Sequence, residues 1–152
     1  MQKMKTIKKI LTILLTLTLS TLFAQKGYNK CDIEKVKTVH ENIDNLTYEM
    51  VENFLLTFDS SCETNIEFSQ WSNEMLYKLF EKDPDLTLKV LEQSNLNNIE
   101  TLLDEIKNPI KETDYQKIYD KILRTEKRSQ LQEKILKSIE VAADKQGLKI
   151  KN

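Results

Sequence analysis

Glycine and proline are scarce in this chain of 152 residues, which contains two of each. Proteins built from strands and hairpins normally need more of both residues at their turns. Charged residues make up 31% of the sequence, and apolar residues recur at spacings of three and four over most of it. The composition therefore gives few strand signals and predicts an all-α fold, at a length that suits one domain.

Histidine is rarer still, with His40 alone, and there are two cysteines, Cys31 and Cys62. Residues 40–44 read H-E-N-I-D, which begins like the helical zinc motif H-E-x-x-H but has Asp44 where the second histidine belongs. The apolar residues around Ile43 account for His40 as a half-buried helical residue. A zinc site would need more ligands of these types, so we predict no metal and no cofactor.

Catalytic motifs are also missing from the sequence. It has no P-loop, no G-x-S-x-G elbow and no G-x-G-x-x-G loop. Acidic pairs such as Glu49 with Glu52 would serve as acid and base only if the fold buried one member. Abundant carboxylates otherwise indicate a solvated surface. The sequence predicts a protein that is not an enzyme, and a carboxylate- or metal-dependent enzyme is the least favoured alternative.

The first 24 residues predict a secretory signal peptide. Four lysines between positions 3 and 9 precede an uncharged apolar run of about 15 residues, Ile10 to Ala24. That run is shorter than the ~20 residues that a membrane-spanning helix needs. We expect cleavage after Ala24, which leaves residues 25–152 as a single helical domain in the periplasm or outside the cell. An uncleaved anchor is the alternative.

The net charge of this expected mature chain is negative. Removing the four N-terminal lysines from 23 basic residues leaves 19, against 24 acidic residues, for a net charge of −5. Nucleic acids and anionic membranes reward clustered lysine and arginine instead. We therefore expect neither nucleic acid nor, after cleavage, a membrane as partner.

Both cysteines lie in the expected mature part of the chain. In an oxidising compartment, two cysteines and no other thiol predict one disulfide, Cys31–Cys62. It would close a loop of roughly 30 residues and stabilise the fold by about 3–4 kcal/mol in the chain-entropy model. It would also hold the first helix, which Asp32 can cap, against the turn that contains Cys62.

A central pair of helices is the most strongly marked part of the sequence. The first runs from Thr47 to Phe58, and its apolar stripe is Met50, Val51, Phe54, Leu55 and Phe58. The second follows a break around Cys62 and ends at Asp83-Pro84, and its stripe is Phe68, Trp71, Met75, Leu76, Leu79 and Phe80. Two stripes of this kind are expected to bury each other.

Further helices follow from start and stop signals. Three apparent capping boxes, Thr64 with Glu67, Asn97 with Glu100 and Thr113 with Gln116, predict helix starts. Gly147 is placed to end the last helix, and the tail after it is expected to be loose. About seven helices result, with short connections that favour antiparallel helical hairpins. We predict a small α-hairpin superhelix, with a compact irregular bundle as the alternative.

Charge is distributed unevenly along the chain. No lysine or arginine occurs between Thr38 and Tyr77, where eight acidic residues give a charge of −8, whereas residues 108–152 carry +4. Such asymmetry can steer a basic partner, unless the two ends neutralise each other in the fold. Trp71 lies among polar residues, as interface anchors often do. The predicted contact residues are Glu63, Glu67, Trp71 and Glu74.

These observations favour a secreted or periplasmic helical module that binds another protein. One concrete form of it is an inhibitor or immunity-type protein for a basic secreted partner. An envelope-associated structural scaffold is the second hypothesis. The sequence does not indicate an oligomeric state.

Overall fold

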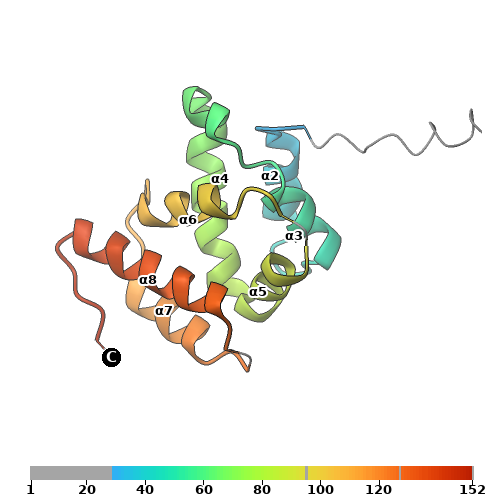
Figure 1. The fold of residues 1–152 in the computed structure, drawn as a ribbon. Coiled ribbons are helices and arrows are strands. Elements are labelled where there is room, and N and C mark those ends of the chain that lie inside the picture. The colour runs from blue at the N-terminus through green and yellow to red at the C-terminus, as the bar shows by residue number, and fades with distance from the viewer. Residues whose placement is uncertain (1–28, 95, 127, 152) are drawn as a thin grey trace, which may run out of the picture.

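The computed structural model describes residues 29–94, 96–126 and 128–151 (Figure 1). The described helices are α2 (Ile33–Glu41), α3 (Tyr48–Leu55), the 3₁₀ helix η1 (Ser60–Thr64), α4 (Ile66–Lys82), α5 (Pro84–Gln93), α6 (Ile99–Lys107), α7 (Tyr115–Leu123) and α8 (Gln130–Lys145). This part of the chain contains no strand, so the all-α prediction is confirmed. The predicted signal peptide, residues 1–24, lies outside the described residues.

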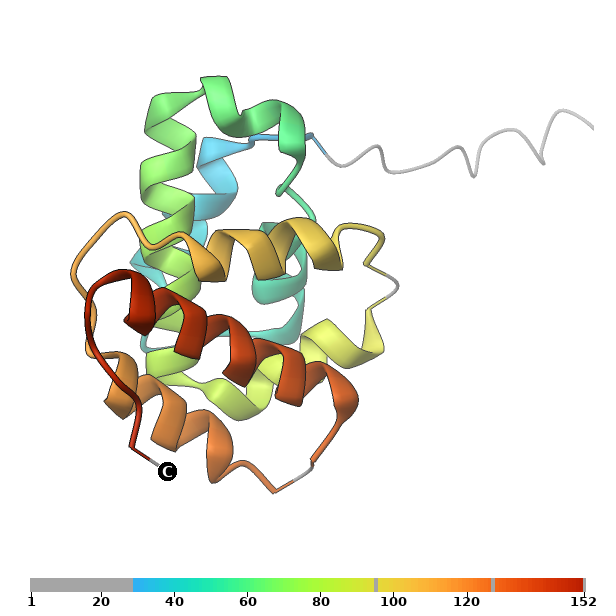
Figure 2. The same ribbon diagram turned by 60° about the vertical axis from the view of Figure 1, so that its left-hand side comes forward.

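The longest helix, α4, is the centre of the fold. Figure 1 shows α2 and α3 on one side of α4, whereas α6, α7 and α8 lie towards its other side. α4 contacts α2, α5, α6 and α7, while α6 and α8 lie side by side (Figure 2). The sequential pairs α2/α3, α4/α5 and α7/α8 are in contact. This packing is compatible with helical hairpins, and the choice between superhelix and irregular bundle stays a prediction.

The two predicted apolar stripes are largely buried in one core. Phe58 joins them, since its ring lies 5.2 Å from that of Phe54 and 5.9 Å from that of Phe68, both edge to face. Each fully buried large side chain contributes roughly 1.5–3 kcal/mol. Met50 is half-buried, and Trp71 is 42% exposed.

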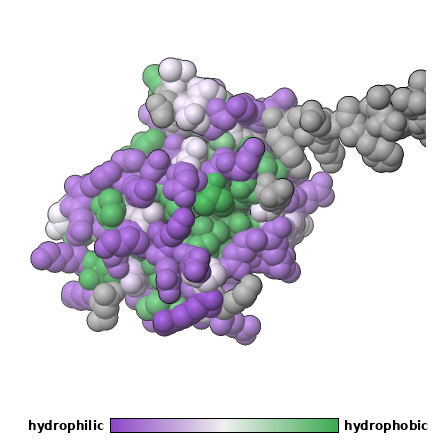
Figure 3. Space-filling view, in the orientation of Figure 1, coloured by the Kyte–Doolittle hydropathy of each residue, from purple (hydrophilic) through white to green (hydrophobic). Residues whose placement is uncertain are grey.

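The surface in Figure 3 is mainly hydrophilic, with a hydrophobic area where α5, α6 and α8 meet. The half-buried side chains of Leu96, Ile99 and Leu131 pack against the core. The gap between these helices has a volume of only about 10 Å³. It is a shallow seam in the core packing rather than a ligand-sized cavity.

Several predicted helix ends are confirmed. Asp32 accepts a hydrogen bond from the Glu34 amide at 3.0 Å, and Thr47 accepts one from Met50 at 3.3 Å. Gly147 has a φ of 73° after α8. Its amide donates to the Asp144 carbonyl and the Leu148 amide to Ala143, which is the Schellman arrangement that glycine favours.

The three predicted capping boxes are wrong by one residue each. The residues that precede the helices are Asn65, Asn98 and Asp114 rather than Thr64, Asn97 and Thr113. Asn65 accepts from Phe68 at 3.1 Å, and Asp114 accepts from Lys117 at 3.0 Å. Asn98 makes no capping bond with its side chain, which bonds elsewhere.

The prediction of a loose tail is also wrong. The Gln116 side chain donates to the Lys151 carbonyl at 3.1 Å and accepts from the Lys151 amide at 2.8 Å. Ile150 packs against the core beside this contact. One amide side chain thus satisfies both backbone groups of a tail residue, which fixes the tail against α7.

Candidate functional site

Trp71 is exposed on α4 because it lies at the edge of the helix's buried stripe. At 100° per residue, Ile66 and Trp71 lie about 140° apart around α4, with Glu67 and Glu74 between them. Met75, one turn after Trp71, is already buried at 4% exposure. The exposed arc of α4 therefore carries carboxylates in its middle and a large apolar side chain at either margin.

The loop between α6 and α7 brings a second exposed isoleucine to α4. Ile66 is 70% exposed and Ile110, between α6 and α7, is 49% exposed. Buried Asn73 of α4 holds this loop: its side chain accepts from the Ile110 amide at 3.0 Å and donates to the Asn108 carbonyl at 3.2 Å. We call Ile66, Glu67, Trp71, Glu74 and Ile110 the α4 face.

The Trp71 margin borders a hollow between α2 and α4. Its volume is about 210 Å³, and its lining residues are His40, Trp71, Glu74, Met75 and Lys78. The His40 and Trp71 rings have their centres 6.3 Å apart and are tilted by 39°. The single histidine and the single tryptophan of the chain thus meet across this hollow, which we call the His40–Trp71 hollow.

Glu74 is already paired in the free protein. It accepts from Lys78 at 3.0 Å on α4 and from Lys111 of the α6–α7 loop. The hydrogen bond from Lys111 is the main reason why the pKa of Glu74 lies below its ordinary value, against the opposing effect of burial. Its carboxylate is therefore charged and held in place at the centre of the α4 face.

Glu67 differs from Glu74. It is exposed, and it forms no ion pair with any other described residue. The nearby Lys37 has a raised pKa, chiefly because it bonds Glu34, with smaller contributions from Glu67 and Glu41. The side chain of Glu63, the remaining predicted contact, lies outside the described residues.

The acidic stretch as a whole is partly neutralised by lysines from outside it. Asp44 pairs with Lys82, and Asp59 pairs with Lys30 at 2.6 Å, while Lys111 reaches Glu74. The fold thus brings three of the eight acidic residues to lysines. The remaining negative charge near Trp71 comes mainly from Glu67 and Glu41.

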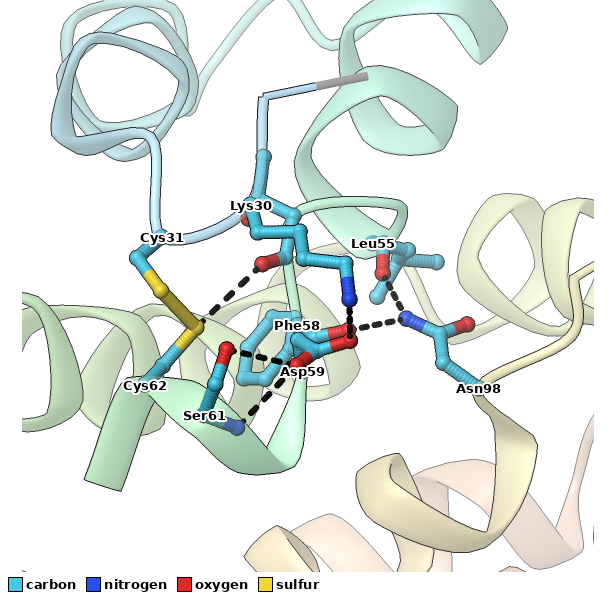
Figure 4. A network of polar contacts seen from close by, with 9 residues as sticks. Lys30, Cys31, Leu55, Phe58, Asp59, Ser61, Cys62 and Asn98 are labelled. Atoms are coloured by element: carbon cyan, nitrogen blue, oxygen red, sulfur yellow. Dashed lines mark hydrogen bonds and ion pairs between the residues drawn. A yellow bond between two sulfur atoms is a disulfide. The ribbon is translucent and has the colours of Figure 1, made fainter. Parts of the chain in front are cut away.

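The disulfide positions α2 for this site. Cys31 and Cys62 are bonded, with Cα atoms 5.5 Å apart, and the Cys31 amide donates to the Thr57 carbonyl at 2.9 Å (Figure 4). The predicted pairing is confirmed. It links the start of α2 to η1, directly before α4, so one wall of the His40–Trp71 hollow is covalently attached to the other.

A network of polar contacts surrounds the segment that contains Cys62. Figure 4 shows Lys30 directed at Asp59, which also accepts from the Ser61 amide at 3.0 Å and its hydroxyl at 2.7 Å. The bond from Lys30 contributes most to lowering the pKa of Asp59. In the same network, the side-chain amide of Asn98 donates to the carbonyls of Leu55 at 2.8 Å and Phe58 at 2.9 Å.

Sequence reasoning identified three described members of the α4 face, Glu67, Trp71 and Glu74, which the fold does bring together on one helix. It missed Ile66 and Ile110. Ile66 stands at the first position of α4, outside the stripe, and Ile110 follows the helix-ending pair Asn108-Pro109. An isolated apolar residue at a helix start or in a loop was the available signal.

Two other kinds of feature are absent from the described ranges. No three His, Cys, Asp or Glu side chains there lie close enough to hold a metal ion. No helix in the same ranges is long and apolar enough to cross a membrane. Neither a family model, nor a curated protein, nor a solved structure matches this chain. The residues of the α4 face are therefore the candidate functional site.

Proposed function

We propose that this protein is an exported, non-enzymatic helical module that binds another protein through the α4 face. The observation that carries the proposal is Trp71, left 42% exposed on α4 with Glu67 one helical turn before it and Glu74 one turn after it. Of the five large hydrophobic side chains exposed in the described residues, Ile66, Trp71 and Ile110 belong to this one face. Leu123 and Leu148 lie apart from them in sequence, after α7 begins.

The chemistry of the α4 face suits an interface. Tryptophan is enriched among residues that dominate binding energy, and such anchors work best when a polar rim excludes water around them. Here Glu67 and Glu74 supply polar groups, and the His40–Trp71 hollow gives a partner side chain somewhere to enter. The rigid support of Asn73 under Ile110 reduces the ordering cost of binding.

The charge balance supports a basic partner. The expected mature chain has a net charge of −5, and Glu67 has no lysine bonded to it among the described residues. A stapled helical body of this size with an acidic contact surface fits an inhibitor or immunity-type role toward a basic secreted protein. Export is supported by the basic and apolar N-terminal sequence and by the disulfide, which persists in oxidising compartments.

A retention experiment with a matched control tests this proposal. The oxidised protein is immobilised, source-cell extract and medium are passed over it, and retained proteins are identified at low and high salt. Trp71→Ala is compared with Leu123→Ala, which truncates a side chain of similar exposure, 38%, on α7. We expect a basic protein that the wild type and Leu123→Ala retain and Trp71→Ala releases.

The expected loss follows from the usual weight of a buried interfacial tryptophan. Such truncations cost at least about 2 kcal/mol, or roughly thirtyfold in Kd. Retention of the same protein by both variants would show that the α4 face is not the interface. Retention of no protein at any salt concentration would contradict the binding role itself.

A further inference from the structure

The His40–Trp71 hollow has the size of one side chain. Its volume of about 210 Å³ is below the 300–1,000 Å³ that is usual for small-molecule pockets. Two of its walls are the flat rings of His40 and Trp71, and a third is the thioether of Met75. A planar group suits this lining better than a branched one, because it can stack on one of the aromatic faces.

One carboxylate and one ammonium group line the hollow, those of Glu74 and Lys78. Glu74 is bonded to Lys78 at 3.0 Å and also to Lys111, and Lys37 is bonded to Glu34 at 2.6 Å. Glu67, one helical turn before Trp71, forms no ion pair with another described residue. Its carboxylate therefore adds uncompensated negative charge beside the aromatic rings.

We propose that the His40–Trp71 hollow receives an arginine side chain of the bound protein. Its guanidinium would stack on Trp71 and donate a hydrogen bond to Glu74, while the charge of Glu67, one helical turn before Trp71, attracts it. This inference rests on the proposed function and specifies the chemistry of its partner.

Arginine fits this site better than lysine does. The guanidinium is planar, stacks on indole rings and presents five donors in a fork, whereas an ammonium is a compact and strongly hydrated charge. Glu74 already accepts one bond at each oxygen from Lys78 and Lys111. A carboxylate has about four acceptor positions, so Glu74 can accept a further donor while it keeps its lysines.

Three short peptides separate charge from shape. We would titrate the oxidised, ¹⁵N-labelled protein with acetyl-Leu-Arg-Leu-amide, with its lysine analogue, and with the analogue that contains citrulline, the neutral isostere of arginine. Ionic strength is held constant throughout. Because the chain has one tryptophan and one histidine, their side-chain NMR signals report on the hollow without ambiguity.

We expect saturable shifts of both ring signals with the arginine peptide and about tenfold weaker binding of the citrulline peptide, with lysine in between. Glu67→Gln should weaken binding of the two charged peptides, which contain arginine and lysine, and leave that of the citrulline peptide unchanged. Glu133→Gln on α8, which removes another exposed carboxylate, should leave its affinity unchanged. Equal binding of the arginine and citrulline peptides, or no saturable shift of the Trp71 and His40 signals, would overturn the inference.

The results also separate this inference from the proposed function. If Trp71→Ala releases the retained protein but the arginine peptide does not bind, the α4 face is the interface and only the arginine assignment fails. If the arginine peptide binds while Trp71→Ala still retains the protein, the hollow binds arginine but is not where the partner docks, which contradicts the proposed function.

Discussion

Removing the disulfide should lower the free energy of unfolding by about 3 kcal/mol. Cys31 and Cys62 are 31 residues apart in sequence, for which loop-closure entropy predicts about 4 kcal/mol at 25 °C. Part of this is offset, because Cys31 has a φ of 56°, a left-handed conformation that costs a non-glycine residue about 1 kcal/mol. Once the bond is absent, the segment before α2 can relax that strain.

Urea unfolding of the oxidised and the reduced wild-type protein measures this difference without changing the packing of the side chains. The Cys31→Ala/Cys62→Ala variant provides the control, since a reducing agent must leave its unfolding curve unaltered. For a domain of this size, the melting temperature should fall by about 10 °C. Trp71 fluorescence is a suitable signal because α2 forms one wall of the hollow.

A difference below about 1 kcal/mol would refute the reasoning. It would mean either that the unfolded chain keeps residues 31 and 62 close together without the bond, or that the native link stores strain beyond that of Cys31. The slope of the urea dependence distinguishes these cases, since residual structure in the unfolded state lowers it.

Asn98→Ala removes both hydrogen bonds that this side chain donates to the carbonyls of Leu55 and Phe58. Urea unfolding should show that the free energy of unfolding falls by about 2–3 kcal/mol, against under about 0.5 kcal/mol for the exposed control Asn97→Ala. Equal losses would remove the bridging role of Asn98. The native pKa of Asp59 lies below its unfolded value, so its contribution is present above about pH 4 and is lost as the pH falls through the native pKa. Urea unfolding between about pH 5 and pH 2 should therefore show a smaller loss for Asp59→Asn than for the wild type; parallel profiles would contradict this. Gly147→Ala should cost about 1 kcal/mol in thermal unfolding although nothing lies within 4 Å of the added Cβ, because φ is 73°; a neutral result would show that the turn adapts.

Apolar periodicity was sufficient to predict the helices, but not the residues at which they start. The capping-box template weights a Glu or Gln three residues on, and this selected Thr64 and Thr113. The adjacent Asn65 and Asp114 are stronger caps than threonine, and they cap α4 and α7. A ranking of the cap residue alone would have placed both starts correctly.

The start of α6 could not be decided locally, since Asn97 and Asn98 are equivalent as caps. The side chain of Asn98 is hydrogen-bonded to the carbonyls of Leu55 and Phe58, which lie 43 and 40 positions earlier in sequence. The contact between the C-terminal tail and α7 could not be predicted for the same reason, because the Gln116–Lys151 hydrogen bonds join residues separated by 35 positions. Such contacts depend on the tertiary fold and leave no local pattern.

The α4 face could be predicted only in part for a similar reason. Trp71 lies in register with buried Phe68 and Met75, and periodicity alone does not show that it lies at the edge of the stripe. The charge pattern left open whether the basic end of the chain neutralises the acidic segment, and in the fold Lys111 reaches Glu74 across 37 positions. The cysteines were the opposite case, since with two candidates the pairing was determined by counting.

The position of the single cross-link also determines how the molecule would respond to force. If the chain were pulled from both ends, the oxidised protein could not extend the segment of 31 residues that the disulfide closes. Roughly 100 Å of contour length would therefore be missing from the extended chain. The helices from α4 onward lie outside that loop and would stretch fully. Under tension, this small domain would divide into a shielded segment that contains α2 and α3 and an extensible segment that contains the rest.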